Sequence, residues 1–261
     1  MLKRIDLLLV ELGIAETRSK AQDLIGEGAV AVDGKMILKP SEKFSEDLMR
    51  ESVFLKESQT QKYVSRGGLK IESVCRRFPL LAALQGAGCI DIGQSTGGFT
   101  DFLLKSGAKS VVGIEVGSGQ IHPSLRTDPR VVTLEKTHFL SLTTEDLRRL
   151  KLAETYGIGV WDVSFISSLP IVKHLAEFLK TNALAVGLIK PQFEYSRYTD
   201  DLKKFSAQNI ANNLFGDLED MAKTAGFETI EFFESGVAGR DGNQEYFLIL
   251  RKIASIKDEI K

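Results

Sequence analysis

Charged side chains stand at two points where predicted strands end. Asp162 follows the apolar run Gly159-Val160-Trp161, and Lys190 follows a run that ends at Ile189. In an open α/β sheet such strand ends meet at one edge, where ligands bind and catalytic groups gather. A lysine buried at that edge loses its proton more readily than one in water, so it can act as a base. Taken singly, each residue is more typical of a solvated surface. Together, and beside the loop described next, they favour a catalytic site.

A glycine-rich loop follows the first strand predicted in this part of the chain and opens a helix; its sequence is Asp91-Ile92-Gly93-Gln94-Ser95-Thr96-Gly97-Gly98-Phe99. Its glycines match neither the dinucleotide-binding spacing nor the phosphate loop, which needs Gly-Lys-Ser/Thr. Glu115 ends the next predicted strand, where its carboxylate can accept hydrogen bonds from both hydroxyls of a ribose. The combination fits S-adenosylmethionine, and a purely structural strand–helix turn is the alternative.

We therefore expect donor contacts from nine residues: Asp91, Gly93, Ser95, Thr96, Gly97, Gly98, Phe99, Glu115 and Asp162. Within this loop, glycines let the backbone approach a ligand closely. We expect the substitution Gly97→Val to place a branched side chain against the donor and to abolish its binding.

From about residue 64 onward, short β-rich runs alternate with helical stretches. Predicted strands cover residues 89–92, 110–115, 131–134, 159–163, 184–189, 228–233 and 245–250, and predicted helices cover 99–105, 169–179 and 209–225. This alternation favours an α/β fold of the Rossmann-like class, with a mostly parallel seven-stranded sheet and helices on both faces. The last two strands are joined by a short glycine-containing connection, residues 235–243, which favours an antiparallel edge.

The first 55 residues are predicted to form a small α+β module. Ile5, Leu8, Leu9 and Leu12 recur at helical spacing, and a second helix is expected after Thr17, a typical N-cap residue. Asp33-Gly34 lies between two apolar runs, 28–32 and 35–38, and is a strong signal for a β-hairpin. A further strand is expected near 52–55, and the polar segment 56–62 lacks periodicity and is predicted to be a linker.

Composition excludes several classes of protein. The 34 Lys+Arg residues nearly balance the 35 Asp+Glu residues, so net charge does not indicate nucleic-acid binding. The longest apolar run, residues 183–189, is far shorter than the roughly 20 residues of a membrane-spanning helix, and the first residues do not resemble a secretory signal. Two cysteines and three scattered histidines do not form a metal-ligand pattern. We expect a cytoplasmic protein without a metal.

Motifs of five to ten residues, in order along nearly the whole chain, resemble the TlyA family. Residues 4–40 are similar to the RNA-binding S4 domain, through Arg4-x-Asp6-Leu7, Thr17-Arg18-x-x-Ala21 and Val30-x-Val32-Asp33-Gly34. The later part resembles the RrmJ/FtsJ class of methyltransferases, through Asp162-Val163-Ser164-Phe165-Ile166 and Ile189-Lys190-Pro191-Gln192-Phe193-Glu194. That family methylates ribose 2′-hydroxyls of cytidines in ribosomal RNA with S-adenosylmethionine, and many of its members are named hemolysins.

The resemblance implies a domain organisation and a catalytic set. It implies an S4-like RNA-binding domain over 1–58, a linker over 59–66, an FtsJ-type methyltransferase domain over 67–255 and a tail over 256–261. The FtsJ-type catalytic residues are Lys-Asp-Lys-Glu, which match Lys70, Asp162, Lys190 and Glu245 here. The donor would be S-adenosylmethionine, and the partner would be ribosomal RNA or a ribosomal subunit.

Seven basic residues are the expected RNA contacts: Lys3, Arg4, Arg18, Lys20, Lys35, Lys39 and Arg66. Residues 1–66 hold eleven basic and eleven acidic residues, so RNA binding requires that the two signs be segregated on the surface. The chain departs from the family pattern after Glu194, where a glycine-rich stretch is usual and this chain has a polar, charged segment over 195–208. We expect that segment to alter the RNA-facing cap.

Two other functions stay open at this point. One is a non-catalytic RNA-binding or ribosome-associated protein with a decayed methyltransferase domain, which the intact set of four residues argues against. The other is a membrane-active hemolysin, which would need a signal sequence, a membrane-spanning helix or a basic amphipathic stretch, and the sequence shows none of these.

Overall fold

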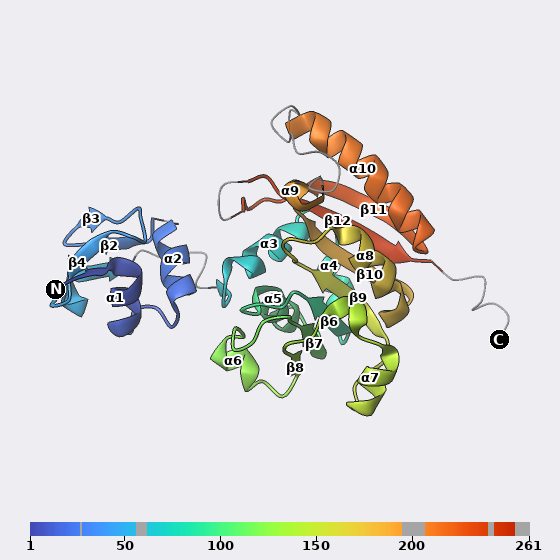
Figure 1. Ribbon diagram of the computed structural model, residues 1–261, viewed down its shortest axis with the longest axis horizontal. Helices are drawn as coiled ribbons and strands as arrows, with labels where there is room; N and C mark the ends of the chain where they lie inside the picture. Colours follow the sequence, from blue (N-terminus) through green and yellow to red (C-terminus); the bar gives the residue numbers. More distant parts are fainter. Residues whose placement is uncertain (27, 56–61, 195–206, 240–242, 254–261) are drawn as a thin grey trace. The chain divides into compact units, whose positions relative to one another are not determined.

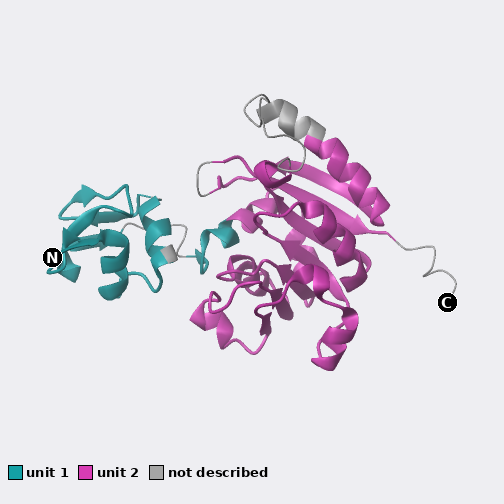
Figure 2. Ribbon diagram, in the orientation of Figure 1, with its two compact units in different colours: residues 1–69 teal, residues 70–261 magenta. Residues whose placement is uncertain are grey.

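The computed structural model describes residues 1–26, 28–55, 62–194, 207–239 and 243–253 (Figure 1). The chain forms two compact units, residues 1–69 and 70–261 (Figure 2). Three segments discussed above lie wholly or partly outside the described residues: the altered segment up to position 206, the predicted tail 256–261, and positions 59–61 of the predicted linker.

The small unit joins two helices to two short antiparallel sheets, β1-β4 and β3-β2-β5. Its elements are β1 (Leu2–Arg4), α1 (Ile5–Glu11), α2 (Arg18–Gly26), β2 (Val30–Val32), β3 (Lys35–Met36), β4 (Lys43–Ser45), a 3-10 turn (Arg50–Ser52) and β5 (Val53–Leu55). The core lies between the helices and the sheets, and the residues predicted from helical spacing, among them Ile5, Leu8 and Leu9, are buried in it. The small α+β unit is therefore confirmed.

The predicted hairpin is present, with a shorter second strand than expected. Asp33 and Gly34 both have positive φ, 48° and 78°, which is the backbone that a tight two-residue hairpin turn requires. Ile37 still donates to the Val30 carbonyl (2.9 Å), but the N–H of Leu38 is directed to the Glu42 carboxylate (3.4 Å). The strand predicted over 35–38 is therefore shorter than expected and ends at Met36.

The large unit is built on a seven-stranded sheet with the strand order β11-β12-β10-β9-β6-β7-β8. The strands are β6 (Gly88–Ile92), β7 (Ser110–Ile114), β8 (Val131–Leu134), β9 (Tyr156–Trp161), β10 (Leu179–Ile189), β11 (Phe227–Glu234) and β12 (Tyr246–Lys252). β6 pairs in parallel with β7 on one side and with β9 on the other, and β12 pairs antiparallel with both β10 and β11. The predicted mostly parallel sheet with an antiparallel edge is confirmed.

Figure 1 shows the helices that follow the linker. They are α3 (Arg66–Val74), which crosses the boundary between the two units, α4 (Leu80–Leu84), α5 (Gly98–Lys105), α6 (Pro123–Arg126), α7 (Thr144–Arg149), α8 (Ser168–Leu175), α9 (Pro191–Glu194) and α10 (Ala207–Thr224). α5 contacts β6 and β7, whereas α8 contacts β10 and also α10, which covers β11. Within the described ranges, no helix has the length and apolar character needed to cross a membrane.

One predicted helix is too long at its C-terminal end. The sequence favoured a helix over 169–179, but α8 ends at Leu175, a 3-10 turn follows over Ala176–Phe178, and Leu179 already pairs with Tyr156 of β9. Leu175, Phe178 and Leu179 are all buried and keep the i, i+3, i+4 spacing of a helix, so the spacing does not mark the boundary.

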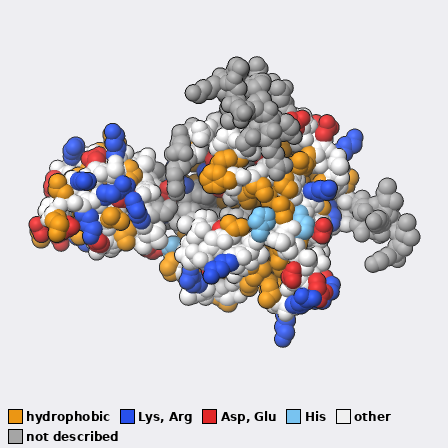
Figure 3. Space-filling model, in the orientation of Figure 1, with side chains coloured by type: hydrophobic (Ala, Val, Ile, Leu, Met, Phe, Trp, Pro, Cys, Tyr) orange, Lys and Arg blue, Asp and Glu red, His pale blue; other side chains and the backbone are white. Residues whose placement is uncertain are grey.

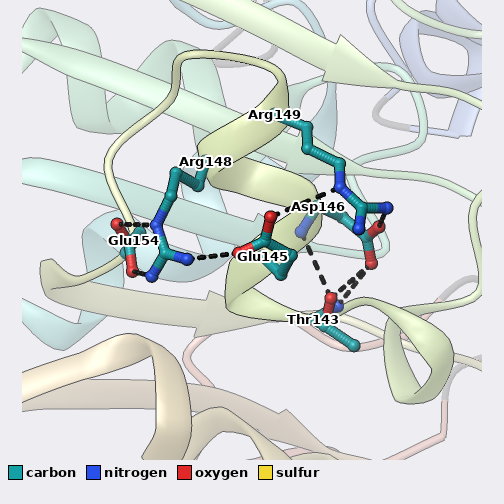
Figure 4. A network of polar contacts seen from close by, with 6 residues as sticks. All are labelled: Thr143, Glu145, Asp146, Arg148, Arg149 and Glu154. Atoms are coloured by element: carbon teal, nitrogen blue, oxygen red, sulfur yellow. Dashed lines mark hydrogen bonds and ion pairs between the residues drawn. The ribbon is translucent and has the colours of Figure 1, made fainter.

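A network of charged side chains covers α7 (Figure 4). Thr143 caps the helix in a capping box with Asp146, each side chain accepting the other's backbone N–H. Arg148 binds Glu154 (2.6 Å) and also Glu145, one turn earlier on the helix. These side chains are largely exposed, so the network contributes little to stability. Its charges pair with one another on a solvated helix face.

Candidate active site

The glycine loop connects β6 to α5 with a backbone that only glycine adopts easily. Gly93 has φ +78°, and its N–H donates to the Ile114 carbonyl of the neighbouring strand β7 (2.9 Å). A Cβ added at Gly93 would lie 2.7 Å from the carbonyl oxygen of Asp162. The loop therefore lies directly against the end of β9, and a side chain at position 93 would separate the two.

A chain of buried hydrogen bonds lies beneath the loop. The hydroxyl of Thr100 donates to Asp91 (2.7 Å), the amide of Gln94 donates to Thr100 (2.9 Å), and the hydroxyl of Thr133 donates to Gln94 (2.8 Å). Burial raises the pKa of Asp91 to about 7, the nearby carboxylates of Asp162 and Glu115 add to this shift, and the bond from Thr100 opposes it. The chain links β6, α5 and β8 under the loop.

Glu115 follows β7 and is nearly buried, with 7% of its surface exposed. Its two carboxylate oxygens accept the backbone N–H groups of Ser95 (2.8 Å) and Gly117 (2.7 Å). Oε1 also accepts a long hydrogen bond from the side-chain amide of Gln120 (3.5 Å), whereas Oε2 keeps a further lone pair with which it can accept a hydrogen bond from a ligand. The carboxylate thus stabilises the loop and also faces the cavity beside it.

A cavity of about 720 Å³ lies between the loop and the segment that follows β9. Four of the nine predicted donor contacts line it, and they are Gly93, Ser95, Glu115 and Asp162. Asp91 lies beneath the loop in the hydrogen-bond chain described above. The other predicted contacts, Thr96, Gly97, Gly98 and Phe99, are not among the residues that line this cavity.

The reason given for expecting Gly97→Val to block the donor is wrong. Gly97 has φ +91°, and a Cβ there would lie 2.4 Å from Leu125 Cδ1 and 2.7 Å from Ile121 Cδ1. The added side chain would therefore collide with the packing of α6 and would not enter the cavity. The glycine is needed because the loop and α6 approach each other closely.

Two ion pairs hold the four residues that match the catalytic set. Lys190 Nζ lies 2.6 Å from Asp162 Oδ1, with side chains 11% and 24% exposed, and it also donates to the hydroxyl of Ser164 (3.1 Å). Lys70 Nζ lies 2.7 Å from Glu245 Oε2, with side chains 12% and 5% exposed. Each lysine is therefore neutralised by one carboxylate in a largely buried setting.

The sheet brings three of these residues to one edge. Asp162 comes directly after β9, Lys190 directly after β10, and Glu245 directly before β12. Ile189 and Tyr246 are paired in the antiparallel register, so Lys190 and Glu245 stand at adjacent positions just beyond that pair. Lys70 reaches this edge from α3 through its contact with Glu245. The strand register and the two ion pairs therefore place the four residues at the same edge of the sheet.

Several residues of the cavity were not predicted as site residues. Gln120, Thr137 and His138 line it, and so do Val163, Ser164, Phe165 and Ile166, which the sequence analysis named only as part of a family motif. Phe165 is 90% exposed and has φ +66°, an unusual backbone for a bulky residue. A signal existed for this segment, since it directly follows Asp162. His138 is one of the three histidines without a metal-ligand pattern, and its exposed side chain lies at the cavity.

The basic residues expected to contact RNA fall into two groups. Lys3 pairs with Glu11 (2.5 Å), Arg4 and Arg18 both bind Asp6 (2.9 and 3.0 Å), and Lys20 donates to the Tyr63 carbonyl (2.8 Å). Lys35 and Lys39 are exposed, and Arg66 opens α3 with partial exposure. Figure 3 shows Lys and Arg side chains gathered on the visible face of the small unit.

Asp6 organises part of this basic surface. Its side chain is fully buried, and it accepts hydrogen bonds from Arg4, Arg18 and Gln22. Despite the burial, these bonds hold the pKa of Asp6 well below its usual range. The side chains of Arg4 and Arg18 remain 38% and 51% exposed, so two guanidinium groups share one carboxylate and still face solvent.

The order of the strands, the glycine loop after β6 and the carboxylate after β7 define a methyltransferase of the doubly wound α/β type. A solved structure described as an S-adenosylmethionine-dependent methyltransferase from Listeria monocytogenes has this fold; it is 16% identical with a TM-score of 0.51, and the match covers 72% of this chain and 99% of that chain. Residues 63–252 match the FtsJ-like methyltransferase model, and residues 3–49 match the S4 domain model.

The chain belongs to the TlyA family of FtsJ-like methyltransferases, and the resemblance predicted from its motifs is confirmed. It is 35% identical over 257 residues to the 16S/23S rRNA (cytidine-2′-O)-methyltransferase TlyA of Mycobacterium tuberculosis, a match covering 95% of this chain and 89% of that protein. A solved structure of a hemolysin-named protein from Streptococcus thermophilus is 32% identical with a TM-score of 0.72, covering 97% of this chain and 90% of that chain.

Proposed function

We propose that this protein transfers a methyl group from S-adenosylmethionine to the ribose 2′-hydroxyl of a cytidine in ribosomal RNA. The proposal rests on two ion pairs, Lys190–Asp162 and Lys70–Glu245. They lie at the sheet edge beside the cavity that Glu115 and Asp162 line. The relative from Mycobacterium tuberculosis is named as a 16S/23S rRNA (cytidine-2′-O)-methyltransferase, which supports the same reaction and substrate.

The residues around the cavity fit the methyl donor. Glu115 offers its carboxylate to the two ribose hydroxyls of the donor, and Gly93 lets the loop lie against the end of β9 beside the cavity. Asp162 lines the same cavity, and its ion pair with Lys190 places the proposed base next to the donor. S-adenosylmethionine, when bound, supplies a methyl group attached to a positively charged sulfur.

Lys190 is the proposed base. A ribose hydroxyl is a weak nucleophile at neutral pH, so a group must remove its proton while the reacting atoms are held close together. In its neutral form the Lys190 amine accepts that proton, and the contacts with Asp162 and Ser164 fix where Nζ lies. Glu245 holds Lys70 in the same way, so Lys70 is proposed to orient the ribose from its own position.

The small unit is proposed to bind the RNA. Lys3, Arg4, Arg18, Lys20, Lys35, Lys39 and Arg66 are the proposed contacts. The exposed guanidinium groups of Arg4 and Arg18, held by Asp6, suit a phosphate, which guanidinium groups recognise by paired hydrogen bonds.

We further propose domain limits of 1–58 and 67–255, with 59–66 as linker and 256–261 as tail. The protein is proposed to act in the cytoplasm on ribosomal RNA or a ribosomal subunit.

One experiment tests the reaction in cells. Ribose methylation is mapped on ribosomal RNA from a strain that lacks this protein, the same strain complemented with the parent sequence, and the same strain complemented with Lys190→Ala. We expect one or more cytidine 2′-O-methyl groups in the parent-complemented strain alone. Lys105→Ala serves as the matched control, since Lys105 also forms an ion pair, with Asp101 (3.0 Å), at a distance in sequence from the proposed site. Equal methylation in all strains would refute the proposal.

The hemolysin hypothesis is examined with the same variants. Haemolysis by purified protein that is equal for the parent and Lys190→Ala, without methyl donor, would favour a membrane-active function. Binding of S-adenosylmethionine, measured by calorimetry, separates the enzyme from a non-catalytic RNA-binding protein, because a decayed pocket would produce no heat of binding.

A further inference from the structure

Glu194 is a buried carboxylate at the end of α9. Only 6% of its surface is exposed, and both of its oxygens accept the backbone N–H of Ser168, at 2.9 and 3.1 Å. Ser168 is the first residue of α8, so the carboxylate lies at the positive end of that helix, where a negative charge is stabilised. Glu194 therefore ties α9 to the start of α8.

Lys190 and Glu194 are the two ends of one helical turn. The carbonyl of Lys190 accepts the N–H of Phe193 (2.9 Å) and the N–H of Glu194 (3.3 Å). Only Pro191, Gln192 and Phe193 separate the two residues, and Pro191 restricts the backbone at the first helical position. A contact that fixes Glu194 in space therefore also restricts where the backbone of Lys190 lies.

The partner of Glu194 is itself fixed relative to Asp162. The Oγ of Ser168 accepts the indole N–H of Trp161 (3.1 Å), and Trp161 is fully buried and directly precedes Asp162. Lys190 in turn contacts Asp162 at 2.6 Å. The contacts form a closed ring, from Asp162 to Lys190, along the turn to Glu194, across to Ser168 and back through Trp161.

We infer that Glu194 is a positioning residue for Lys190, a role that rests on the proposed function of Lys190 as the base. The carboxylate holds the far end of the turn against α8, and the near end then delivers Nζ to Asp162 and Ser164. Glu194 acts through the backbone, because its two oxygens are turned toward Ser168. If the Glu194–Ser168 contact is removed, the turn of α9 keeps only the Lys190–Asp162 ion pair among the contacts of this ring.

The first test is a double-mutant cycle in single-turnover methylation of ribosomal RNA. Misplacing a reacting group by about 1 Å can cost 10²-fold in rate, so we expect Glu194→Ala to lower the methylation rate by about 10- to 10²-fold. Glu194→Gln keeps an oxygen that accepts the Ser168 N–H, so it should restore most of that loss. The double variant Glu194→Ala, Lys190→Ala should be no slower than Lys190→Ala alone, since Glu194 acts only through Lys190.

Ser167→Ala is the matched control. Ser167 also bonds to the first turn of α8, through the N–H of Leu169 (3.2 Å), but it has no contact with α9 among the hydrogen bonds described. This variant weakens the same helix terminus and should methylate at the parent rate. If Ser167→Ala and Glu194→Ala lose equal activity, or if the double variant is slower than Lys190→Ala by the full factor, Glu194 is merely structural and the inference is overturned.

A second readout does not depend on methylation. The Lys190 side chain is 11% exposed, so its amine should react slowly with acetic anhydride, whereas Lys105, at 52% exposure, should react readily. We expect Glu194→Ala to raise the labelling of Lys190 several-fold relative to Lys105, as measured by peptide mass spectrometry. Unchanged labelling would refute the positioning role even in an active enzyme. If the parent protein does not methylate RNA, the proposed function is refuted. The labelling of Lys190 in Glu194→Ala still shows, independently of activity, whether Glu194 holds the turn.

Discussion

The buried carboxyl group of Asp91 should make the free energy of unfolding depend on pH. Its pKa rises from an ordinary 3.8 to about 7, chiefly through burial, which disfavours the charged form. Because the folded value lies above the unfolded one, the group stabilises the fold fully below pH 3.8, and this contribution is lost as the pH rises through 7. At about 1.4 kcal/mol per pKa unit, the total loss is about 4 kcal/mol, of which about 2–3 kcal/mol falls between pH 5 and pH 8.

Asp91→Asn removes this titration and keeps an oxygen that accepts the bond from Thr100. The free energy of unfolding is measured in urea at pH 5, 6, 7 and 8, and the fluorescence of Trp161 reports on the large unit alone. Trp161 is the single tryptophan of the chain, and it pairs with Ile92, the neighbour of Asp91, in the sheet register. We expect the parent to lose about 2–3 kcal/mol more than the variant over this range.

Asp128→Asn is the control, since Arg130 lowers the pKa of Asp128 and its titration is complete below this pH range. Equal losses in the parent and in Asp91→Asn between pH 5 and pH 8 would refute the reasoning. They would mean that Asp91 is already ionised in the folded protein, with water or a cation compensating its charge.

Three further predictions concern the proposed activity. Lys190→Ala should bind S-adenosylmethionine normally in calorimetry and yet methylate at least about 10²-fold more slowly, the usual effect of a lost general base; a rate within a few-fold of the parent would remove Lys190 from the mechanism. Gly93→Ala should weaken donor binding, since its Cβ would stand 2.7 Å from the Asp162 carbonyl; unchanged binding heat would contradict this. Arg18→Ala should lower the salt slope of RNA binding by about 1 and leave donor affinity intact, whereas an unchanged slope would assign Arg18 to the Asp6 cluster alone.

The sequence was sufficient for the elements whose residues carry a local signal. The β-strands of the large sheet are apolar runs bounded by polar residues, and Asp33-Gly34 requires a backbone that few other residue pairs adopt. The short strands β1 and β4 were not predicted, because each holds a single apolar residue among polar ones and neither adjoins a turn signal such as Asp33-Gly34. The boundary between α8 and β10 was misplaced for a different reason, since the buried residues Leu175, Phe178 and Leu179 keep helical spacing across it.

The sequence was enough to name most residues of the candidate site, but not to show how they contact one another. Strand ends suggested that Asp162 and Lys190 lie at one edge, and the family motif added Lys70 and Glu245, whose assigned roles stay predictions. The pairing of Lys70 with Glu245 joins α3 to the start of β12, and no local pattern links residues so far apart. The atoms that a side chain at Gly97 would meet belong to Ile121 and Leu125, which lie later in the chain, so the loop sequence alone could not reveal the collision.

The two ion pairs of the site have a consequence for its response to ionic strength. Each lysine is matched by one carboxylate, so the four groups carry no net charge and contribute little long-range attraction for a polyanion. Capture of RNA must then depend on exposed cations elsewhere, whose contacts weaken steeply with salt. Charges buried at close range are screened far less. As potassium chloride is added, the rate at low RNA concentration should therefore fall, whereas the rate at saturating RNA should stay the same. Measuring both rates separates RNA binding from the methyl-transfer step.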